Sequence, residues 1–361
     1  ASAAGGVGNS YAAVVRGAFG STLSNSGHIM AETEADDAQA TGALLVSLYG
    51  AVSVTNGGLI QAVAEGDVAN ATGVGAIGLA GTGVSVTNSG QIIAAANGDD
   101  ATATALRMES ASINKLVNSG SISALGDGER IAISSEGTAT ADILNTGTIT
   151  GAIQTGSLDD RLVNGSGGNW FALGASIFGD GNDSLTNAAG GLIDVVGGTI
   201  AMEDGNDTIT NHGTFRLTGG NVTMGAGTNA FTNVGILKVL GTSAVDVGAA
   251  GTLTNISSID FIDGATDDKL TVTGTLAGAG VLNLDLNLLT STVDQVVVTG
   301  NVAASAVQTV NVQAPGLPTT AHTSAVFGRV SGTSTASNFV AGQIFGYSPA
   351  NFLDLDLTVS S

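Results

Sequence analysis

A chain of 361 residues in which 43% are hydrophobic and only 11% are charged is expected to fold, because disordered chains are poor in apolar and rich in charged residues. Its formal charge of −21 repels nucleic acid and anionic lipid, which excludes both as expected partners. Without cysteine, the chain has neither a disulfide framework nor a cysteine-based catalytic or metal site.

In chain order, the first recurring element is a turn built on asparagine, such as NSGHI, NGGLI or NTGTI. Clear copies begin at Asn25, Asn56, Asn88, Asn118 and Asn145, looser ones at Asn187, Asn211, Asn233 and Asn255, and a degenerate one at Asn164. A short segment of alternating apolar and polar residues precedes each turn, which is the period of a half-buried strand. The segments between turns are too short and too rich in Val, Thr and Gly for helices, so the sequence predicts an all-β protein.

The asparagines recur at intervals of about 30 residues up to Asn145 and of about 23 residues after it. Three strands of about five residues with three turns make one triangular coil of that length. We therefore predict a right-handed parallel β-helix of roughly 22–32 residues per coil with a C-terminal β cap. The expected segments are a long-coil region 1–150, a short-coil region 151–265 and a C-terminal region with its cap, 266–361.

Acidic segments account for the greater length of the early coils. They are ETEADD from Glu32, AEGD from Ala64, NGDD from Asn97 and GDGE from Gly126, at a similar phase of each repeat. We interpret them as extra loops that stack into one negative ridge, with a solvated edge favoured over a cation or ligand site. The same stacking places the repeated asparagines in a buried ladder of amide hydrogen bonds, which is a structural role.

The next element is an aspartate-rich turn, GDGNDSL from Gly179 and EDGNDTI from Glu203. When the coils are aligned on their asparagines, Asp160, Asp183 and Asp207 fall in one column, and Asp180 and Asp204 form a second row. Stacked carboxylates repel each other and favour a bound divalent cation, so these five residues are the candidate calcium ligands. Part of the turn also matches the calcium-binding repeat of RTX β-rolls, although that repeat returns every nine residues. The alternative interpretation is an exposed acidic turn without a metal.

Residues for catalysis are scattered. Only Arg161 and Arg216 among the basic residues lie near the aspartate column, and the histidines are dispersed at His28, His212 and His322. No GxSxG or HExxH motif is present, so no catalytic residue is predicted and the protein is interpreted as a non-enzyme. A polysaccharide-degrading β-helix enzyme is the alternative, and it requires the aspartates and one of these arginines to converge in a groove. The aromatic residues of NWFALGASIF, Trp170, Phe171 and Phe178, are expected to fill the core.

Near the C-terminus, three segments follow one another as TDDKLTVTG from Thr266, LNLDL from Leu282 and DQVVVTG from Asp294. Together with the asparagine coils and the GDGND turns, this order resembles the pertactin-like passenger domains of bacterial autotransporters. The resemblance covers about four-fifths of the chain. It implies a β-helix that is exported through an outer-membrane β-barrel and whose C-terminal region folds first and caps the rod.

The resemblance also implies what the protein does. The expectation is a surface-displayed adhesin, self-associating protein or stalk of a Gram-negative bacterium, with roles of the kind seen in virulence and biofilm formation. Its partner would be a ligand on a host or neighbouring cell, or a second copy, and the full-length protein would continue into the β-barrel. The first residues, ASAAGGVGNS, lack the basic start and apolar core of a signal peptide, and no apolar run has membrane-spanning length, so we expect a mature protein or a piece of a larger one. The residues assigned to the cap are Pro315, Pro318, Pro349, Phe339, Phe345, Tyr347 and Phe352.

Overall fold

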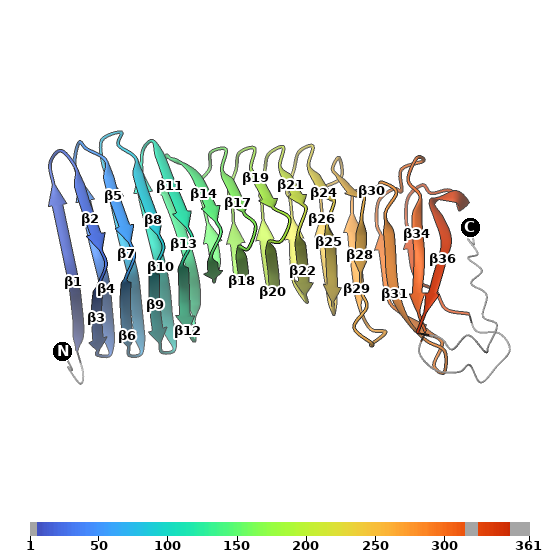
Figure 1. The fold of residues 1–361 in the computed structure, drawn as a ribbon, viewed down its shortest axis with the longest axis horizontal. Coiled ribbons are helices and arrows are strands. Elements are labelled where there is room, and N and C mark those ends of the chain that lie inside the picture. Colours follow the sequence, from blue (N-terminus) through green and yellow to red (C-terminus); the bar gives the residue numbers. More distant parts are fainter. Residues whose placement is uncertain (1–5, 315–323, 347–361) are drawn as a thin grey trace.

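The computed structural model describes residues 6–314 and 324–346, and these residues form a long all-β rod (Figure 1). The chain winds from the N-terminal end of the rod to the opposite end, so strands of successive coils lie side by side. With the exception of one short antiparallel pair and one isolated bridge, the neighbouring strands of the described residues are parallel. The predicted parallel β-helix is confirmed.

Each coil contributes strands to three faces. Face 1 is an 11-stranded sheet. Its strands are β2 (Ser21–Asn25), β5 (Val52–Asn56), β8 (Val84–Asn88), β11 (Ile113–Asn118), β14 (Thr140–Asn145), β17 (Arg161–Asn164), β19 (Ser184–Asn187), β21 (Thr208–Asn211), β24 (Ala230–Asn233), β27 (Thr252–Asn255) and β30 (Thr275–Ala277).

Face 2 follows face 1 in each coil, after an asparagine turn in the coils from Asn25 to Asn255. Its strands are β3 (His28–Glu34), β6 (Leu59–Glu65), β9 (Gln91–Asn97), β12 (Ser121–Gly126), β15 (Thr148–Thr150), β18 (Asn169–Ile177), β20 (Leu192–Ala201), β22 (Thr214–Thr218), β25 (Ile236–Leu240), β28 (Ser258–Asp260), β31 (Val281–Asn287), β34 (Gln308–Gln313) and β36 (Phe339–Phe345).

Face 3 closes the coil. Its strands are β1 (Val7–Gly17), β4 (Asp37–Ser47), β7 (Val68–Gly78), β10 (Asp100–Ser110), β13 (Glu129–Gly137), β16 (Ala152–Gln154), β23 (Asn221–Thr223), β26 (Thr242–Asp246), β29 (Lys269–Thr273), β33 (Gln295–Val298) and β35 (Gly328–Val330). Faces 2 and 3 form one sheet because β18 and β20 are long enough to pair on both. A short strand β32 (Thr292–Val293) pairs antiparallel with β31.

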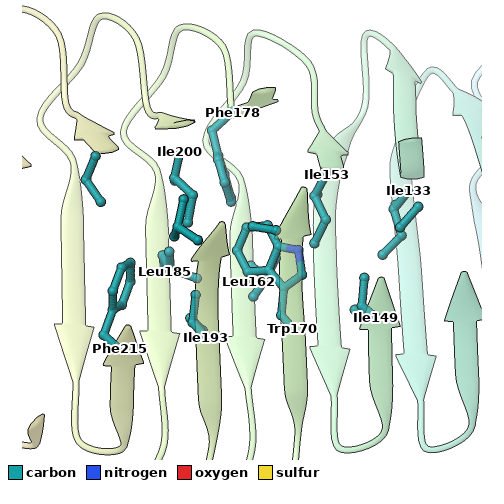
Figure 2. Close-up of a cluster of buried hydrophobic side chains, with 14 of the residues drawn as sticks. Ile133, Ile149, Ile153, Leu162, Trp170, Phe178, Leu185, Ile193, Ile200 and Phe215 are labelled. Carbon is teal, nitrogen blue, oxygen red and sulfur yellow. The ribbon is translucent and has the colours of Figure 1, made fainter. Parts of the chain in front are cut away.

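The core is the interior of the coils. Along each strand alternate side chains point inward, so every second residue of a strand is buried, as Leu185 is in β19 and Phe215 and Leu217 are in β22. Figure 2 shows Trp170, Phe178 and Phe215 directed into this interior among isoleucine and leucine side chains. Trp170 and Phe178 are fully buried, and the Trp170 indole donates a hydrogen bond to Gly151 O at 3.1 Å. Phe171 alternates with Trp170 and is only half-buried, so the expected core role holds for two of the three aromatics.

The greater length of the early coils has a different cause from the one the sequence suggested. The extra residues are not loops, because they extend the strands: β3 has 7 residues and β4 has 11, whereas β22 has 5 and β23 has 3. The extended parts of the two faces pack through alanine, as in the fully buried stack of Ala62 and Ala94. Small side chains let two sheets lie close together, so the strands continue where a loop was expected. The acidic residues Asp36, Asp67 and Asp99 lie exposed at the turns that join these faces.

The buried asparagine ladder is confirmed. Ten asparagines at the ends of the face 1 strands bond in series, each Nδ2 donating to the Oδ1 of the next at 2.8–2.9 Å. The degenerate copy at Asn164 is a full member. At the C-terminal end Asn255 donates instead to Gln308 Oε1 at 2.8 Å, which closes the ladder.

The described part of the predicted cap consists of β34, β35 and β36 and a 3-10 turn, η1 (Ala336–Asn338). In this part Phe339 packs edge-on against Phe327, with ring centroids 5.8 Å apart, and the side chain of Phe345 is exposed. The other cap residues, Pro315, Pro318, Tyr347, Pro349 and Phe352, lie outside the described residues. No helix in residues 6–314 and 324–346 is long and apolar enough to cross a membrane.

Candidate functional site

Three aspartates occupy the same position in successive coils, in the turn that leads into face 1. Asp160, Asp183 and Asp207 are 2%, 1% and 0% exposed. The interpretation as an exposed acidic turn is therefore wrong for this column. Its burial follows from strand alternation continued backward by one step, since Asp183, Leu185 and Asn187 all face the interior.

Each carboxylate of the column accepts a backbone N–H from the preceding coil. Asp160 Oδ1 accepts from Ala141 N at 2.6 Å, Asp183 Oδ1 from Asp160 N at 2.7 Å, and Asp207 Oδ1 from Asp183 N at 2.9 Å. A backbone donor buried at a corner of the coil needs such a partner, because strand pairing ends there. The aspartates therefore join consecutive coils.

Asn229 is the fourth member of the column and shows what the position requires. Its Oδ1 accepts from Asp207 N at 2.9 Å, as an aspartate would, and its Nδ2 donates to Met224 O at 2.5 Å and Val247 O at 3.3 Å. In the three aspartates the corresponding Oδ2 atoms are buried and have no hydrogen-bond partner within the described residues. A proton on Oδ2 would supply the donor that Asn229 carries as an amide, whereas an ionised carboxylate supplies none.

The electrostatics of the column favour the neutral form. Burial raises the pKa of Asp183 to about 8, and the nearby carboxylates of Asp160 and Asp207 add to the effect. Burial also raises the pKa of Asp207 to about 6, with a further contribution from the charge of Asp204. The pKa of Asp160 is raised as well, again chiefly by burial.

The second row of candidate calcium ligands lies outside the interior. Asp180 and Asp204 are exposed in the same turns, and Asp204 Oδ1 accepts from Ala226 N at 3.1 Å. Within residues 6–314 and 324–346, no group of three or more His, Asp or Glu side chains is placed to hold a metal ion. Calcium binding by the five aspartates stays a prediction for titration.

A second set of buried carboxylates, which the sequence analysis did not single out as a site, lies near the C-terminal end. Asp294 accepts from Asp268 N at 3.2 Å and from Asp285 N at 2.7 Å, and Asp285 in turn accepts from Asp263 N and Gly264 N at 2.8 and 2.7 Å. Burial raises the pKa of Asp294 to about 7. Asp268 precedes β29 as Asp183 precedes β19, so the same alternation rule would have identified its inward direction.

The basic residues near the column have other partners. Arg161 Nη1 lies 2.8 Å from Asp142 Oδ1, and Arg216 Nη2 lies 2.5 Å from Asp194 Oδ2. His212 is exposed in an asparagine turn. The structure does not bring the aspartates and these arginines together in the arrangement that a glycan-degrading site requires. His28 is also exposed, and His322 lies outside the described residues.

Comparison with known proteins found no match to the sequence, either among protein-family models or among curated proteins. The resemblance to autotransporter passengers therefore rests on the motifs quoted above.

Proposed function

We propose that this chain is a non-enzymatic, surface-displayed rod, part of the passenger of a bacterial autotransporter, which acts in adhesion or self-association or as a stalk. The observation that carries the proposal is that the buried polar side chains form hydrogen bonds from one coil to the next. The asparagine ladder and the aspartate column satisfy backbone and side-chain groups from coil to coil. Carboxylates that are sealed in the wall hold the rod together and are not accessible to an external substrate.

The ordered C-terminal segments support the autotransporter part of the proposal. They form the strands β29, β31 and β33 on faces 2 and 3, in the order in which the segments follow one another in the sequence. In this proposal the full-length protein continues into an outer-membrane β-barrel, and the rod extends outside the cell. Its binding surface is an extended face, which fits a large ligand on another cell or a second rod.

The test is to display the chain on a bacterial surface through an outer-membrane barrel and to measure settling of the cells and their adherence to host cells. Cells that carry the barrel alone are the control for the anchor. In a second control the long coils, residues 6–137, are deleted and the rest of the rod is displayed. Comparison with the complete rod then separates binding by the long coils from binding by the short coils. The proposal predicts settling or adherence above the barrel control. Release of reducing sugar ends from polysaccharides, with no settling or adherence, would contradict it.

A calcium-loaded rod is a second candidate, favoured by the unpartnered Oδ2 atoms of Asp160, Asp183 and Asp207. A cation that binds only the folded state raises the melting temperature as its concentration increases. Titration with calcium and with magnesium at equal ionic strength should then show a rise with calcium that is absent in Asp183→Asn. Equal responses to both ions, or none, would leave the column without a calcium role.

A further inference from the structure

The chain contains three Asn-Gly pairs, which differ in burial and in hydrogen bonding. They are Asn56–Gly57, Asn97–Gly98 and Asn164–Gly165. Asparagine before glycine is the sequence most prone to intramolecular cyclisation, because glycine has no Cβ to hinder the approach of its peptide nitrogen to the asparagine side chain. Whether the reaction occurs in a folded protein depends on the freedom of these two groups.

Two of the pairs are locked in the asparagine ladder. Asn56 is fully buried, and its Nδ2 donates to Asn88 Oδ1 at 2.8 Å and to Gln91 O at 3.0 Å. The nitrogen of Gly57, which would have to attack, donates to Asn25 O at 2.8 Å. Neither group can turn toward the other without breaking the ladder.

The Asn164–Gly165 pair is held in the same way. Asn164 Nδ2 donates to Asn187 Oδ1 at 2.9 Å and to Leu192 O at 3.0 Å. Gly165 N donates to Asn145 O at 2.7 Å. This pair is therefore also protected in the folded protein.

The third pair, Asn97–Gly98, lies outside the asparagine ladder. It is exposed at the end of β9, and Gly98 has a φ of 155° in the turn that leads to β10. Within the described residues, the Asn97 side chain and the Gly98 N–H have no hydrogen-bond partner, so no hydrogen bond must break before they react, although the Gly98 backbone packs closely on Gly66 O. Asn97 lies in register with Glu65, which lies in register with Glu34, so its side chain adjoins the exposed acidic turns of the long coils.

We propose that Asn97 is a site of spontaneous deamidation in the folded protein. The Gly98 nitrogen loses its proton to base and forms a bond to the Asn97 side-chain carbonyl carbon, and the bond from that carbon to Nδ2 breaks with release of ammonia. Water then opens the resulting succinimide at either carbonyl, which gives aspartate or isoaspartate. The reaction requires only water and base.

The product changes the acidic turns in two ways. A new carboxylate extends the column of Glu34 and Glu65, and isoaspartate adds a methylene to the main chain beside the hydrogen bond from Gly66 N to Asn97 O, which is 3.1 Å long. Deamidation therefore makes the exposed edge more negative and loosens the stacking of two turns.

The test is to incubate the folded chain at mildly alkaline pH and to follow the three Asn-Gly peptides by mass spectrometry after digestion. Asn56 and Asn164 can react only through local unfolding of core coils, so Asn97 is expected to convert at least about a hundredfold faster. In urea the three rates should come within about tenfold of one another, because only local sequence then differs.

The variant Asn97→Gln provides a second test. It should abolish the fast charge change measured by ion exchange, since the glutamine side chain would need a less favourable six-membered ring. Comparable rates at the three sites of the folded chain, or no conversion at Asn97, would overturn the proposal.

Discussion

The long coils before β14 and the short coils after it fill the same kind of interior with different residues. In the long coils the extended strands of faces 2 and 3 pack through stacked alanines, of which Ala62 and Ala94 are examples. In the short coils Phe215 and Phe231 fill the interior, with ring centroids 5.4 Å apart. Coil length and side-chain size therefore compensate, because a flattened coil accommodates small residues and a compact triangular coil requires large ones.

The two regions also differ in their charged groups. The acidic residues of the long coils lie mostly at exposed turns, whereas the short coils bury Asp160, Asp183 and Asp207. The cost of burial is partly offset there, because each carboxylate accepts a hydrogen bond from a backbone N–H that has no partner in a neighbouring strand. This contrast predicts opposite responses to pH and to substitution in the two regions.

The largest effect is expected from pH. The unfolded pKa of an aspartate is about 3.9, and burial raises that of Asp183 to about 8 in the folded state. Between these values the folded state binds a proton that the unfolded state has lost, so stability falls by about 1.4 kcal/mol per pH unit for such a group. No further loss from Asp183 is expected above its folded pKa.

Urea denaturation at a series of pH values measures this slope. Asp183→Asn should keep the hydrogen bond to Asp160 N, supply an amide donor like that of Asn229, and reduce the slope between about pH 4 and pH 8. Asp180→Asn, an exposed change in the same turn, is the matched control and should leave the slope as it is. Stability that rises steadily over this range in the wild type would contradict a neutral column.

The next effect concerns the large residues of the short coils. Phe231 is fully buried, so Phe231→Ala should leave a cavity and cost about 3–5 kcal/mol of unfolding free energy. Phe19→Ala in the long coils is the control, because Phe19 is 87% exposed and its loss should change stability by less than about 0.5 kcal/mol. Thermal or urea unfolding compares the two. Similar costs would show that the aromatic core does not carry the short coils.

The converse substitution tests the alanine packing of the long coils. Ala62 lies between Ala31 and Ala94 in a closed stack, so Ala62→Leu should overpack it and cost about 1–3 kcal/mol. Gln61→Leu adds a similar apolar side chain on the outward side of the same strand and should be nearly neutral. An Ala62→Leu variant as stable as the wild type would mean that the flattened coils have spare volume.

Much of this contrast could be predicted from the sequence, and the features that could not be predicted have physical reasons. The asparagine turns predict the coil, the ladder and the position of Asp183 in the repeat, because each follows from the repeat and the two-residue period of a strand. The inward direction of Asp183 also follows from this period, because Asp183 lies two residues before the buried Leu185. The extended strands at the acidic turns were harder to predict, since alternating alanine beside polar residues is a weak strand signal and Gly98 and Asp99 suggest a loop. The partner of Asn255 could not be predicted, because Gln308 belongs to a coil with irregular spacing.

The smallest effect concerns the ion pairs of the two regions. In the long coils Arg107 and Glu136 form a pair at 2.8 Å whose side chains are 39% and 45% exposed, and hydrogen bonding to Arg107 lowers the pKa of Glu136. Solvent screens such a pair, so Glu136→Gln should cost less than about 1 kcal/mol, and the cost should disappear in high salt. It should also vanish as pH falls through the lowered pKa of folded Glu136, below which the glutamate is protonated in both states, and this is the opposite of the Asp183 response. Asp194→Asn, at a pair whose carboxylate is only 5% exposed, should cost several-fold more in the same urea titration, because it leaves the Arg216 guanidinium without a charged partner. Equal costs for the two substitutions would show that burial does not separate the electrostatics of the long and the short coils.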